Sequence, residues 1–304
     1  MSVARPLHLP DLEVFREPGR HNPTVLRRVL GALLRQRREA AGMEAQRAAG
    51  ILQCSPATIS RLETQGLGLT ERKVAALLSA YGESESDIAA CVLLVRDADR
   101  PGWWQRYDDV LPKWLDALIA LQDACSVIRT YEVQLVPGLL QTKEYATCVT
   151  RGRPYLTPEQ VERLVRLRME RQDLLWRSDA PNLWVLLHEW VLETPGGGPR
   201  VMREQLEHLI KMAEQPHITL QLTQVRDQYG PVVANPITYL RFDQLSLPDT
   251  VYLEDLEDAR FLDRRSECDR YRSMLDTLLN YAASPEDTVR LLKAKARSLQ
   301  ARSL

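Results

Sequence analysis

The sequence predicts a mainly helical protein, α+β overall, in which a small five-helix domain precedes a larger, helix-rich α+β domain with a small sheet. Helix start signals and apolar stripes recur at short intervals over residues 24–100. Pro101-Gly102 then interrupts the chain, and beyond it short β-rich runs alternate with amphipathic segments. The length of 304 residues fits about two such domains.

The small domain is expected to follow a loose N-terminal arm. Residues 1–23 contain four prolines and few periodic apolar positions, which predicts an extended arm. Thr24 is a candidate N-cap for the first helix, and Gly42 is expected to end that helix. The five helices of this domain, which spans 24–100, are predicted over 25–41, 44–52, 56–64, 71–81 and 85–96.

The second domain is predicted to span residues 101–304. Apolar periodicity predicts its helices over 110–130, 141–150, 158–177, 199–214 and 260–282, with one more after Ser284-Pro285. Four runs rich in β-forming residues predict strands over 183–189, 218–224, 237–242 and 249–255. We therefore expect a small sheet covered by helices.

The stretch CSPATISRLET, residues 54–64, carries a specific local pattern. Ser55 is a natural N-cap, and Pro56 suits the first helical position because its missing N–H costs nothing there. Ile59 and Leu62 form an apolar stripe, while most other positions are small or polar. We expect a short helix that buries one face and leaves the other open to close approach by a partner.

This helix follows a shorter one across a tight turn, and a basic helix precedes both. That arrangement matches a helix-turn-helix, whose second helix enters the major groove of DNA. The net charge of the whole chain is only −1, but residues 20–64 hold eight arginines against three glutamates. The local excess of positive charge favours binding of nucleic acid at this segment.

The sequence LGALLRQRREAAGMEAQRAAGILQCSPATISRLET resembles the repressor-type domain of the XRE family, the Cro and phage-repressor-like regulators. The resemblance implies a five-helix fold that binds double-stranded operator DNA as a two-fold homodimer. It implies a phosphate contact by Ser55 and a structural ion pair between Arg38 and Glu63. It also implies base contacts by four residues: Pro56, Ala57, Ser60 and Arg61.

One position departs from the family pattern. The second helix begins with Glu44-Ala45 where the family has Thr-Gln, so the glutamine that grips a backbone phosphate is absent. We expect other side chains to supply phosphate contacts. The candidates are arginines of the first two helices: Arg27, Arg28, Arg35 and Arg47.

The second domain resembles a C-terminal domain of unknown function that accompanies XRE-type regulators in actinomycetes. The resemblance spans roughly 101–290 and implies no particular ligand. It is carried by five blocks in order: PGWWQRYDDVLPKWL, YEVQLVPGLLQTKEYA, RLRMERQDLL, LHEWVLETPGGGPRVMREQLEHL and VYLED.

Aromatic residues of the second domain leave two interpretations open. Large aromatic side chains usually belong to a hydrophobic core. Alternatively, they line a small-molecule pocket in which Tyr145 and Glu189 supply polar groups. The candidate pocket residues are Trp103, Trp104, Tyr145, Trp184 and Glu189.

Two further segments of the second domain also allow two interpretations each. The predicted helix over 158–176 either packs internally or forms a dimer seam. The glycine-rich segment 196–201 is either a plain turn or an anion cradle at a helix start.

Other function classes find little support in the sequence. We expect no enzyme, metal site or cofactor, because GxSxG, GxGxxG after a strand and spaced Cys/His clusters are all missing. No apolar run approaches the roughly 18 residues of a membrane span, so no membrane contact is expected. The five scattered cysteines favour free thiols in a reducing compartment, which indicates a cytoplasmic protein.

Two hypotheses of function follow from these observations. The first is a transcriptional regulator that binds operator DNA as a homodimer, while its C-terminal domain senses a small-molecule effector or a partner protein. The second is an antitoxin-like interaction module whose C-terminal domain binds a small partner protein, DNA binding being secondary.

Overall fold

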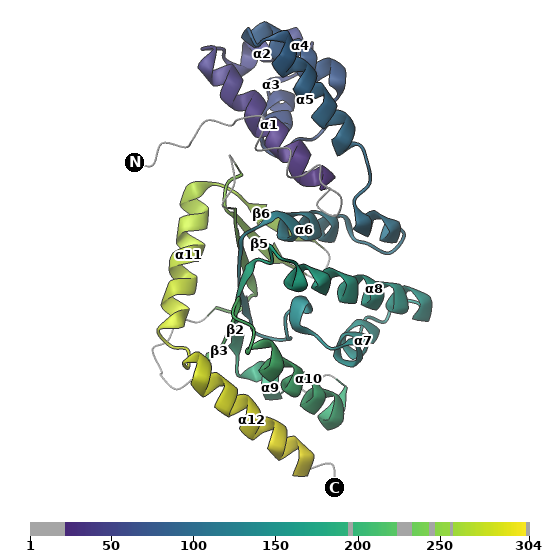
Figure 1. Cartoon of the computed structure of the whole chain (residues 1–304), viewed down its shortest axis with the longest axis vertical. Coiled ribbons are helices and arrows are strands. Elements are labelled where there is room, and N and C mark those ends of the chain that lie inside the picture. The colour runs from purple at the N-terminus through teal and green to yellow at the C-terminus, as the bar shows by residue number, and fades with distance from the viewer. Residues whose placement is uncertain (1–21, 194–196, 224–232, 243–246, 256–257, 302–304) are drawn as a thin grey trace. The chain divides into compact units, whose positions relative to one another are not determined.

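The computed structural model describes residues 22–193, 197–223, 233–242, 247–255 and 258–301 (Figure 1). The chain divides into two compact units. The first contains the described parts of 1–105, 116–124 and 242–247, and the second those of 106–115, 125–241 and 248–304. The expected N-terminal arm, residues 1–23, lies outside the described residues except for Asn22 and Pro23.

The first unit begins with helices in the order that the sequence predicts. Their bounds are α1 (Pro23–Ala40), α2 (Ala45–Ile51), α3 (Pro56–Gln65), α4 (Glu71–Tyr81) and α5 (Glu85–Ala98). The apolar stripe of α1 is buried together with Ile59 and Leu62 of α3 and Leu77 and Leu78 of α4. A short 3-10 helix (Trp103–Tyr107) follows α5. Its residues 103–105 belong to the first unit, as do residues 116–124 of α6 (Lys113–Ala124).

Local capping sets the starts of these helices. In three of them the cap side chain accepts a hydrogen bond from the backbone N–H three residues later: Ser55, Thr70 and Ser84. The first helix differs from the prediction, because its N-cap is Asn22 and not Thr24. Asn22 Oδ1 accepts from the N–H of Val25 at 3.1 Å. Pro23 occupies the first helical position, which suits its fixed φ and leaves Thr24 inside the helix.

The described part of the second unit is built on one mixed sheet, with the strand order β3-β2-β1-β4-β5-β6. The strands β1, β2 and β3 run parallel, β4 joins β1 antiparallel, and β5 and β6 add further antiparallel strands. Their bounds are β1 (Val127–Glu132), β2 (Asn182–His188), β3 (Ile218–Thr223), β4 (Ile237–Arg241), β5 (Thr250–Glu254) and β6 (Ala259–Leu262).

Helices connect the parallel strands and close the chain. Between β1 and β2 lie a 3-10 helix (Gly138–Leu140), α7 (Lys143–Arg151), α8 (Pro158–Arg171) and a second 3-10 helix (Gln172–Trp176). Between β2 and β3 lie α9 (Trp190–Glu193) and α10 (Gly198–Met212), and after the sheet come α11 (Arg265–Leu279) and α12 (Pro285–Ala301). Within this unit, α11 covers one face of the sheet, and α7 and α8 lie on the other (Figure 1).

The prediction missed two strands. The helix expected over 110–130 ends at Ala124, and β1 occupies the rest of that range. The helix expected over 260–282 begins at Arg265, after the short strand β6. Local periodicity does not reveal β1, because its partners β2 and β4 lie far away in the sequence. The sheet is therefore larger than the small sheet that we expected.

Each face of this sheet has its own character. One buried cluster joins strand residues to α11: Tyr131, Leu186, Ile237, Tyr239, Val251 and Leu253 with Cys268, Leu275 and Leu278. Because side chains alternate along a strand, neighbours of these residues point to the opposite face. That opposite face carries polar residues near the ends of two strands: Thr130, Glu132, Tyr252 and Glu254.

Gly31 of α1 lies where the backbones of α1 and α3 approach each other closely. A methyl carbon at this position would lie 2.4 Å from the carbonyl oxygen of Leu62 and 2.9 Å from that of Glu63. We expect Gly31→Ala to lower the free energy of unfolding by about 1–3 kcal/mol, the range for overpacked sites. Urea unfolding followed by circular dichroism would measure the change.

Gly50 of α2 supplies the matched control for this substitution. A methyl group there meets no other atom within 4 Å. Gly50→Ala should raise the free energy of unfolding by about 0.5–1 kcal/mol, because alanine has fewer unfolded conformations to lose. Equal effects of the two substitutions would contradict the close contact of α1 with α3.

Candidate nucleic-acid interface

The helices α2 and α3 form a helix-turn-helix. The turn between them contains Gln53, whose φ is 51°. The N–H of Gln53 donates to the carbonyl of Gly50 at 3.2 Å, and the N–H of Cys54 to that of Ala49 at 3.0 Å. This is the Schellman arrangement, which ends a helix through one left-handed residue. This arrangement ends α2 at Ile51, and Ser55, four residues later, caps α3.

The third helix has one buried and one exposed face. Ile59 and Leu62 are 0 % exposed and anchor α3 in the core. Their spacing leaves the other side of the helix outside the core. The four residues predicted to contact bases lie together on this exposed side: Pro56, Ala57, Ser60 and Arg61. The surface they form combines small side chains, which permit close approach, with one guanidinium.

Two of the arginines predicted to contact phosphate already hold carboxylates. Arg27 Nη2 donates to Oδ1 of Asp99 at 2.8 Å, and Arg35 Nε donates to Oε1 of Glu39 at 2.9 Å. Exposed pairs of this kind contribute about 0–1 kcal/mol, so either guanidinium can exchange its carboxylate for a phosphate at little cost.

The remaining residues predicted to contact phosphate lie on three different elements. Arg28 is half-buried on α1, and Arg47 is exposed on α2. Ser55 is exposed at the start of α3, where its Oγ accepts from the N–H of Thr58 at 3.2 Å. The start of a helix attracts anions because its first N–H groups point outward. Of these residues, Arg47 and Ser55 are therefore placed best for contact with a phosphate.

The ion pair expected between Arg38 and Glu63 is present in the structure. Arg38 Nε donates to Glu63 Oε1 at 2.6 Å, and Nη2 donates to Oε2 at 2.9 Å, a two-point contact. Arg38 Nη1 also donates to the carbonyl of Met43 at 2.8 Å. The hydrogen bond to Glu63 raises the pKa of Arg38, and burial raises that of the neighbouring Tyr81 to about 12. The pair joins the end of α1 to the interior side of α3.

The residues predicted to line a ligand pocket fall in both units. Trp103 and Trp104 belong to the first unit, and Tyr145, Trp184 and Glu189 belong to the second. Trp104 and Tyr145 are 0 % exposed. The rings of Trp103 and Trp104 meet edge to face with their centroids 5.8 Å apart. The two tryptophans of the first unit thus pack against each other.

Trp184 and Glu189 lie at or beside β2. Trp184 Nε1 donates to Oε1 of Gln221 at 2.8 Å, and the guanidinium of Arg129 lies 5.2 Å from a Trp184 ring centroid. Glu189 is half-buried. A single pocket shared by all five residues stays a prediction.

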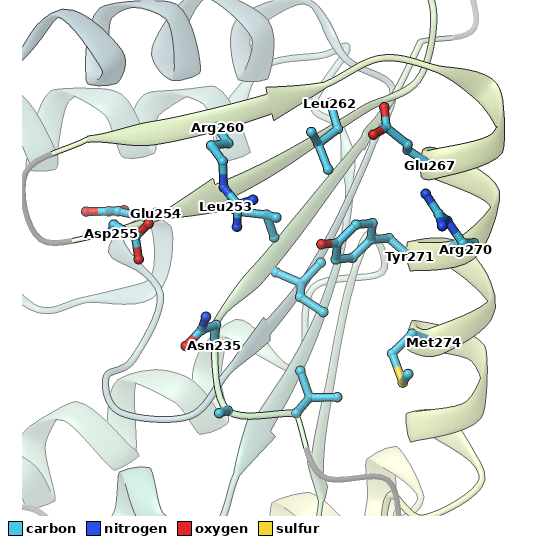
Figure 2. Close-up of a pocket in the computed structure, with 13 residues that line it drawn as sticks. Asn235, Leu253, Glu254, Asp255, Arg260, Leu262, Glu267, Arg270, Tyr271 and Met274 are labelled. Atoms are coloured by element: carbon cyan, nitrogen blue, oxygen red, sulfur yellow. The ribbon is translucent and has the colours of Figure 1, made fainter.

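A cavity of about 620 Å³ lies elsewhere in the second unit (Figure 2). Figure 2 shows Glu254 and Asp255 at one end of it and Arg270 and Tyr271 of α11 on the opposite side. The five predicted pocket residues are not part of its lining. Its volume is within the range of small-molecule sites.

The fold and the exposed face of α3 define a helix-turn-helix domain, a class of domain that suggests DNA binding. Residues 29–91 match a family described as Helix-turn-helix domain. Residues 115–294, more than half of the chain, match the family described as Domain of unknown function (DUF5753), and the chain belongs to that family. The predicted order of the two domains is thereby confirmed. No curated protein and no solved structure matches the chain.

Three further observations concern other kinds of site. Among the described residues, no helix combines the length and the apolar character that crossing a bilayer requires. The same residues include no group of His, Cys, Asp or Glu side chains placed to hold a metal ion. None of the five cysteines, all of which are described, forms a disulfide bond.

Sequence reasoning missed two residues that shape this interface. Gly31 lets the backbone of α1 approach α3, and the signal for it was a single glycine inside an apolar helical stripe. Gln53 ends α2 in a left-handed conformation, for which glycine or asparagine is the usual signal. Because glutamine rarely adopts this conformation, no local pattern marks the turn at that residue.

Removing Arg38 should destabilise the first unit. Arg38→Met leaves the Glu63 carboxylate buried without its partner, which typically costs about 3–5 kcal/mol. The double variant Arg38→Met, Glu63→Met removes both charges and should recover most of that loss. Urea unfolding would measure the free energy of unfolding for each variant.

The control for this prediction is Arg35→Met on the same helix. Arg35 makes an exposed pair with Glu39, so its loss should change the free energy of unfolding by less than about 0.5 kcal/mol. A loss in Arg38→Met no larger than in this control would show that the buried pair does not constrain α3.

Proposed function

We propose that the protein is a transcriptional regulator of the XRE type, which binds operator DNA as a homodimer and acts by binding, without catalysis. In this proposal α3 enters the major groove. The observation that carries it is the exposed face of α3, where Pro56, Ala57, Ser60 and Arg61 lie opposite the buried Ile59 and Leu62. Its cytoplasmic location is part of the same proposal.

Arg61 is the residue proposed to read sequence. A guanidinium in the major groove forms two parallel hydrogen bonds with O6 and N7 of a guanine. Its neighbours Ala57 and Ser60 are small, so the helix backbone can approach the base edges. Arg47 and the start of α3 are proposed to bind phosphates and so to fix the orientation of the helix.

The homodimer is proposed on geometric grounds. One recognition helix contacts only a few base pairs, and proteins of this class double that number through two half-sites related by a two-fold axis. Half-sites about 34 Å apart, one helical turn of DNA, would place both α3 helices on the same side of the duplex.

The second unit is proposed to sense a small molecule or a partner protein. Its cavity supports the first possibility. Two exposed indoles, Trp176 and Trp190, each 61 % exposed, support a protein contact, because tryptophan is enriched in interfaces. This second observation favours the alternative function, an antitoxin-like module that binds a small partner protein. Co-purification of one small protein at a fixed ratio, lost in Trp176→Ser, would establish that alternative.

Operator binding would test the main proposal. The full chain should bind DNA from its own promoter about 10³-fold or more tightly than a scrambled duplex at physiological salt. The logarithm of affinity should fall linearly with the logarithm of salt concentration, by about 0.9 for each phosphate contact. Mobility shifts at several salt concentrations measure both quantities. Equal affinity for the two duplexes would contradict sequence-specific regulation.

Two arginine variants should separate base contacts from phosphate contacts. Arg61→Ala should cost about 1–3 kcal/mol on the operator, with little effect on scrambled DNA, and relax preference at one base pair. Arg47→Ala should weaken binding to both duplexes alike and reduce the salt slope by about 1. The control is Arg96→Ala. Arg96 of α5 forms an exposed pair with Glu71 of α4, and its loss should leave both affinities unchanged. The assignment of Arg61 fails if its loss affects both duplexes equally.

A further inference from the structure

The register of the sheet places two glutamates on one face. Thr130 of β1 lies opposite Thr238 of β4, which in turn lies opposite Tyr252 of β5. Directly paired residues share a face of the sheet, and so do residues two positions apart in a strand. Glu132 and Glu254 therefore lie on the face of Thr130 and Tyr252, at the edge where β1 and β5 both end.

Helix α8 brings two arginines to this face. Arg168 and Arg171 are three positions apart, so they project from the same side of the helix. Arg171 interacts electrostatically with both Glu132 and Glu254, and Arg168 interacts with Glu254. All four side chains are only partly exposed. Together they form a mixed cluster of charged groups at the sheet edge.

The hydrogen bonds of Arg168 and Glu132 leave part of their polar capacity unused. Within the described residues, the guanidinium of Arg168 makes one bond, from Nη1 to the neutral amide oxygen of Gln141 at 2.5 Å. A guanidinium carries five N–H donors, so most of those of Arg168 remain available. The Glu132 carboxyl accepts from Oγ1 of Thr130 at 3.0 Å, a neutral partner.

Tyr145 of α7 adds a further polar group to the cluster. It is fully buried, and its hydroxyl oxygen accepts from the N–H of Val136 at 3.4 Å. Tyr145 interacts electrostatically with both Arg168 and Glu132, which places its phenol near the two groups. The phenol hydrogen is a donor. The sequence already indicated Tyr145 as a polar residue of a pocket.

Burial shifts the charge balance of this cluster towards positive. Burial raises the pKa of Glu132 to about 8, so at neutral pH its carboxyl is mostly protonated. Burial lowers the pKa of Arg168 to about 10, and the charges of Arg171 and Arg153 act in the same direction. Both values still lie above 7, so Arg168 stays charged while Glu132 is neutral. An added anion would relieve this imbalance.

The cluster lies where mixed and parallel sheets bind ligands. Ligands of open α/β sheets bind outside the carboxyl ends of the strands, at the position where the direction of the connections changes. Glu132 ends β1, whose neighbours are the parallel β2 and the antiparallel β4. Glu254 also lines the 620 Å³ cavity, but Ile237 and Leu253 of that lining belong to the face that α11 covers, so the cavity lies across the sheet from the cluster. On the face of the cluster itself, Glu132, Arg168 and Arg171 are partly exposed, which leaves them open to contact with a small anion.

We propose that Glu132, Tyr145, Arg168 and Arg171 bind the oxyanion of a small-molecule effector, either a carboxylate or a phosphate. The arginines supply charge-assisted N–H donors, whose forked geometry suits both groups. The protonated Glu132 and the Tyr145 hydroxyl donate further hydrogen bonds. The word effector rests on the proposed regulatory function, whereas the binding itself does not.

Thermal unfolding of the full chain with two probe anions tests this site. Succinate and inorganic phosphate are titrated separately against sodium chloride at equal ionic strength. A ligand that binds only the folded state raises the Tm in a saturable way. We expect such a rise with at least one probe, and the stronger probe identifies the oxyanion as carboxylate or phosphate.

Matched variants on α8 locate the binding. Arg168→Met should raise the half-saturating concentration by roughly tenfold or more, because it removes charge-assisted bonds to the anion. Arg166→Met is the control: Arg166 is exposed on the same helix and pairs with Glu162 at 3.0 Å. It should bind the probe like the parent chain. Should Arg168→Met fail to fold, Arg168→Lys replaces it. Lysine keeps the positive charge but lacks the forked N–H donors of a guanidinium, so this variant should also bind the anion more weakly.

Glu132 gives the site a pH signature that a purely structural cluster would lack. As pH rises through about 8, Glu132 loses its proton and then repels the anion, so succinate binding should weaken. The groups that interact with Glu132 are Glu254, Arg171, Thr130, Tyr145 and Tyr252, and burial raises the pKa of both tyrosines, away from this pH range. Glu132→Gln should bind succinate with the same affinity at pH 7 and pH 9.

Two results would overturn the site. One is a Tm that responds to neither anion beyond the response to chloride. The other is an anion-dependent rise in Tm that is the same in Arg168→Met as in the control Arg166→Met. If Arg168→Lys has replaced Arg168→Met, the same comparison applies to it. Operator binding is measured separately, so failure of the site and failure of the regulator proposal are distinct. If the affinity for the operator is the same with and without saturating anion, the anion is not an effector, although it still binds at this site.

Discussion

The buried ion pair between Arg38 and Glu63 is the constraint on which the proposed DNA-binding face of α3 depends. One guanidinium holds the carboxylate of α3 at two points and also binds the carbonyl of Met43, in the connection that leads to α2. A buried pair adds little net stability compared with apolar side chains, but any rotation of α3 would leave a buried charge alone. Gly31 supports the same arrangement, because it lets the backbone of α1 reach α3. The contacts on the buried side of α3 thus determine which residues the helix exposes on its other side.

The arrangement of charges in the first unit limits how many arginines remain for DNA. The sequence shows a local excess of arginine, but the fold pairs several of these residues with acids. Arg27 contacts Asp99 and Arg37 lies 3.7 Å from Glu83, and both acids come from later in the chain. The positive charge that α2 and α3 themselves present comes from Arg47 and Arg61. The proposed affinity for DNA therefore depends on a few arginine positions more than on the total number of arginines.

The second unit uses buried charge in the opposite way. In the first unit, Arg38 and Glu63 satisfy each other at two points. At the sheet edge, Arg168 bonds a neutral amide and Glu132 bonds a hydroxyl, although both are strongly desolvated. Buried polar groups that are only partly satisfied lower stability, and proteins retain them mostly at sites of function. This contrast separates a structural ion pair from a candidate binding site within one chain.

The sequence by itself determined the features that depend on neighbouring residues. Ser55 and Thr70 cap their helices, and Ile59 and Leu62 face inward, because capping and helical periodicity act over a few positions. The position of the helix-turn-helix before the second domain also follows from the sequence. The resemblance to repressor domains also gave the pairing of Arg38 with Glu63. Only the tertiary structure decided that Val127–Glu132 is a strand, since its hydrogen bonds come from β2 and β4, far along the chain. For the same reason the meeting of Glu132 with Arg171 and Glu254 could not be predicted: strand register and helix packing bring these groups together, and no local pattern encodes either.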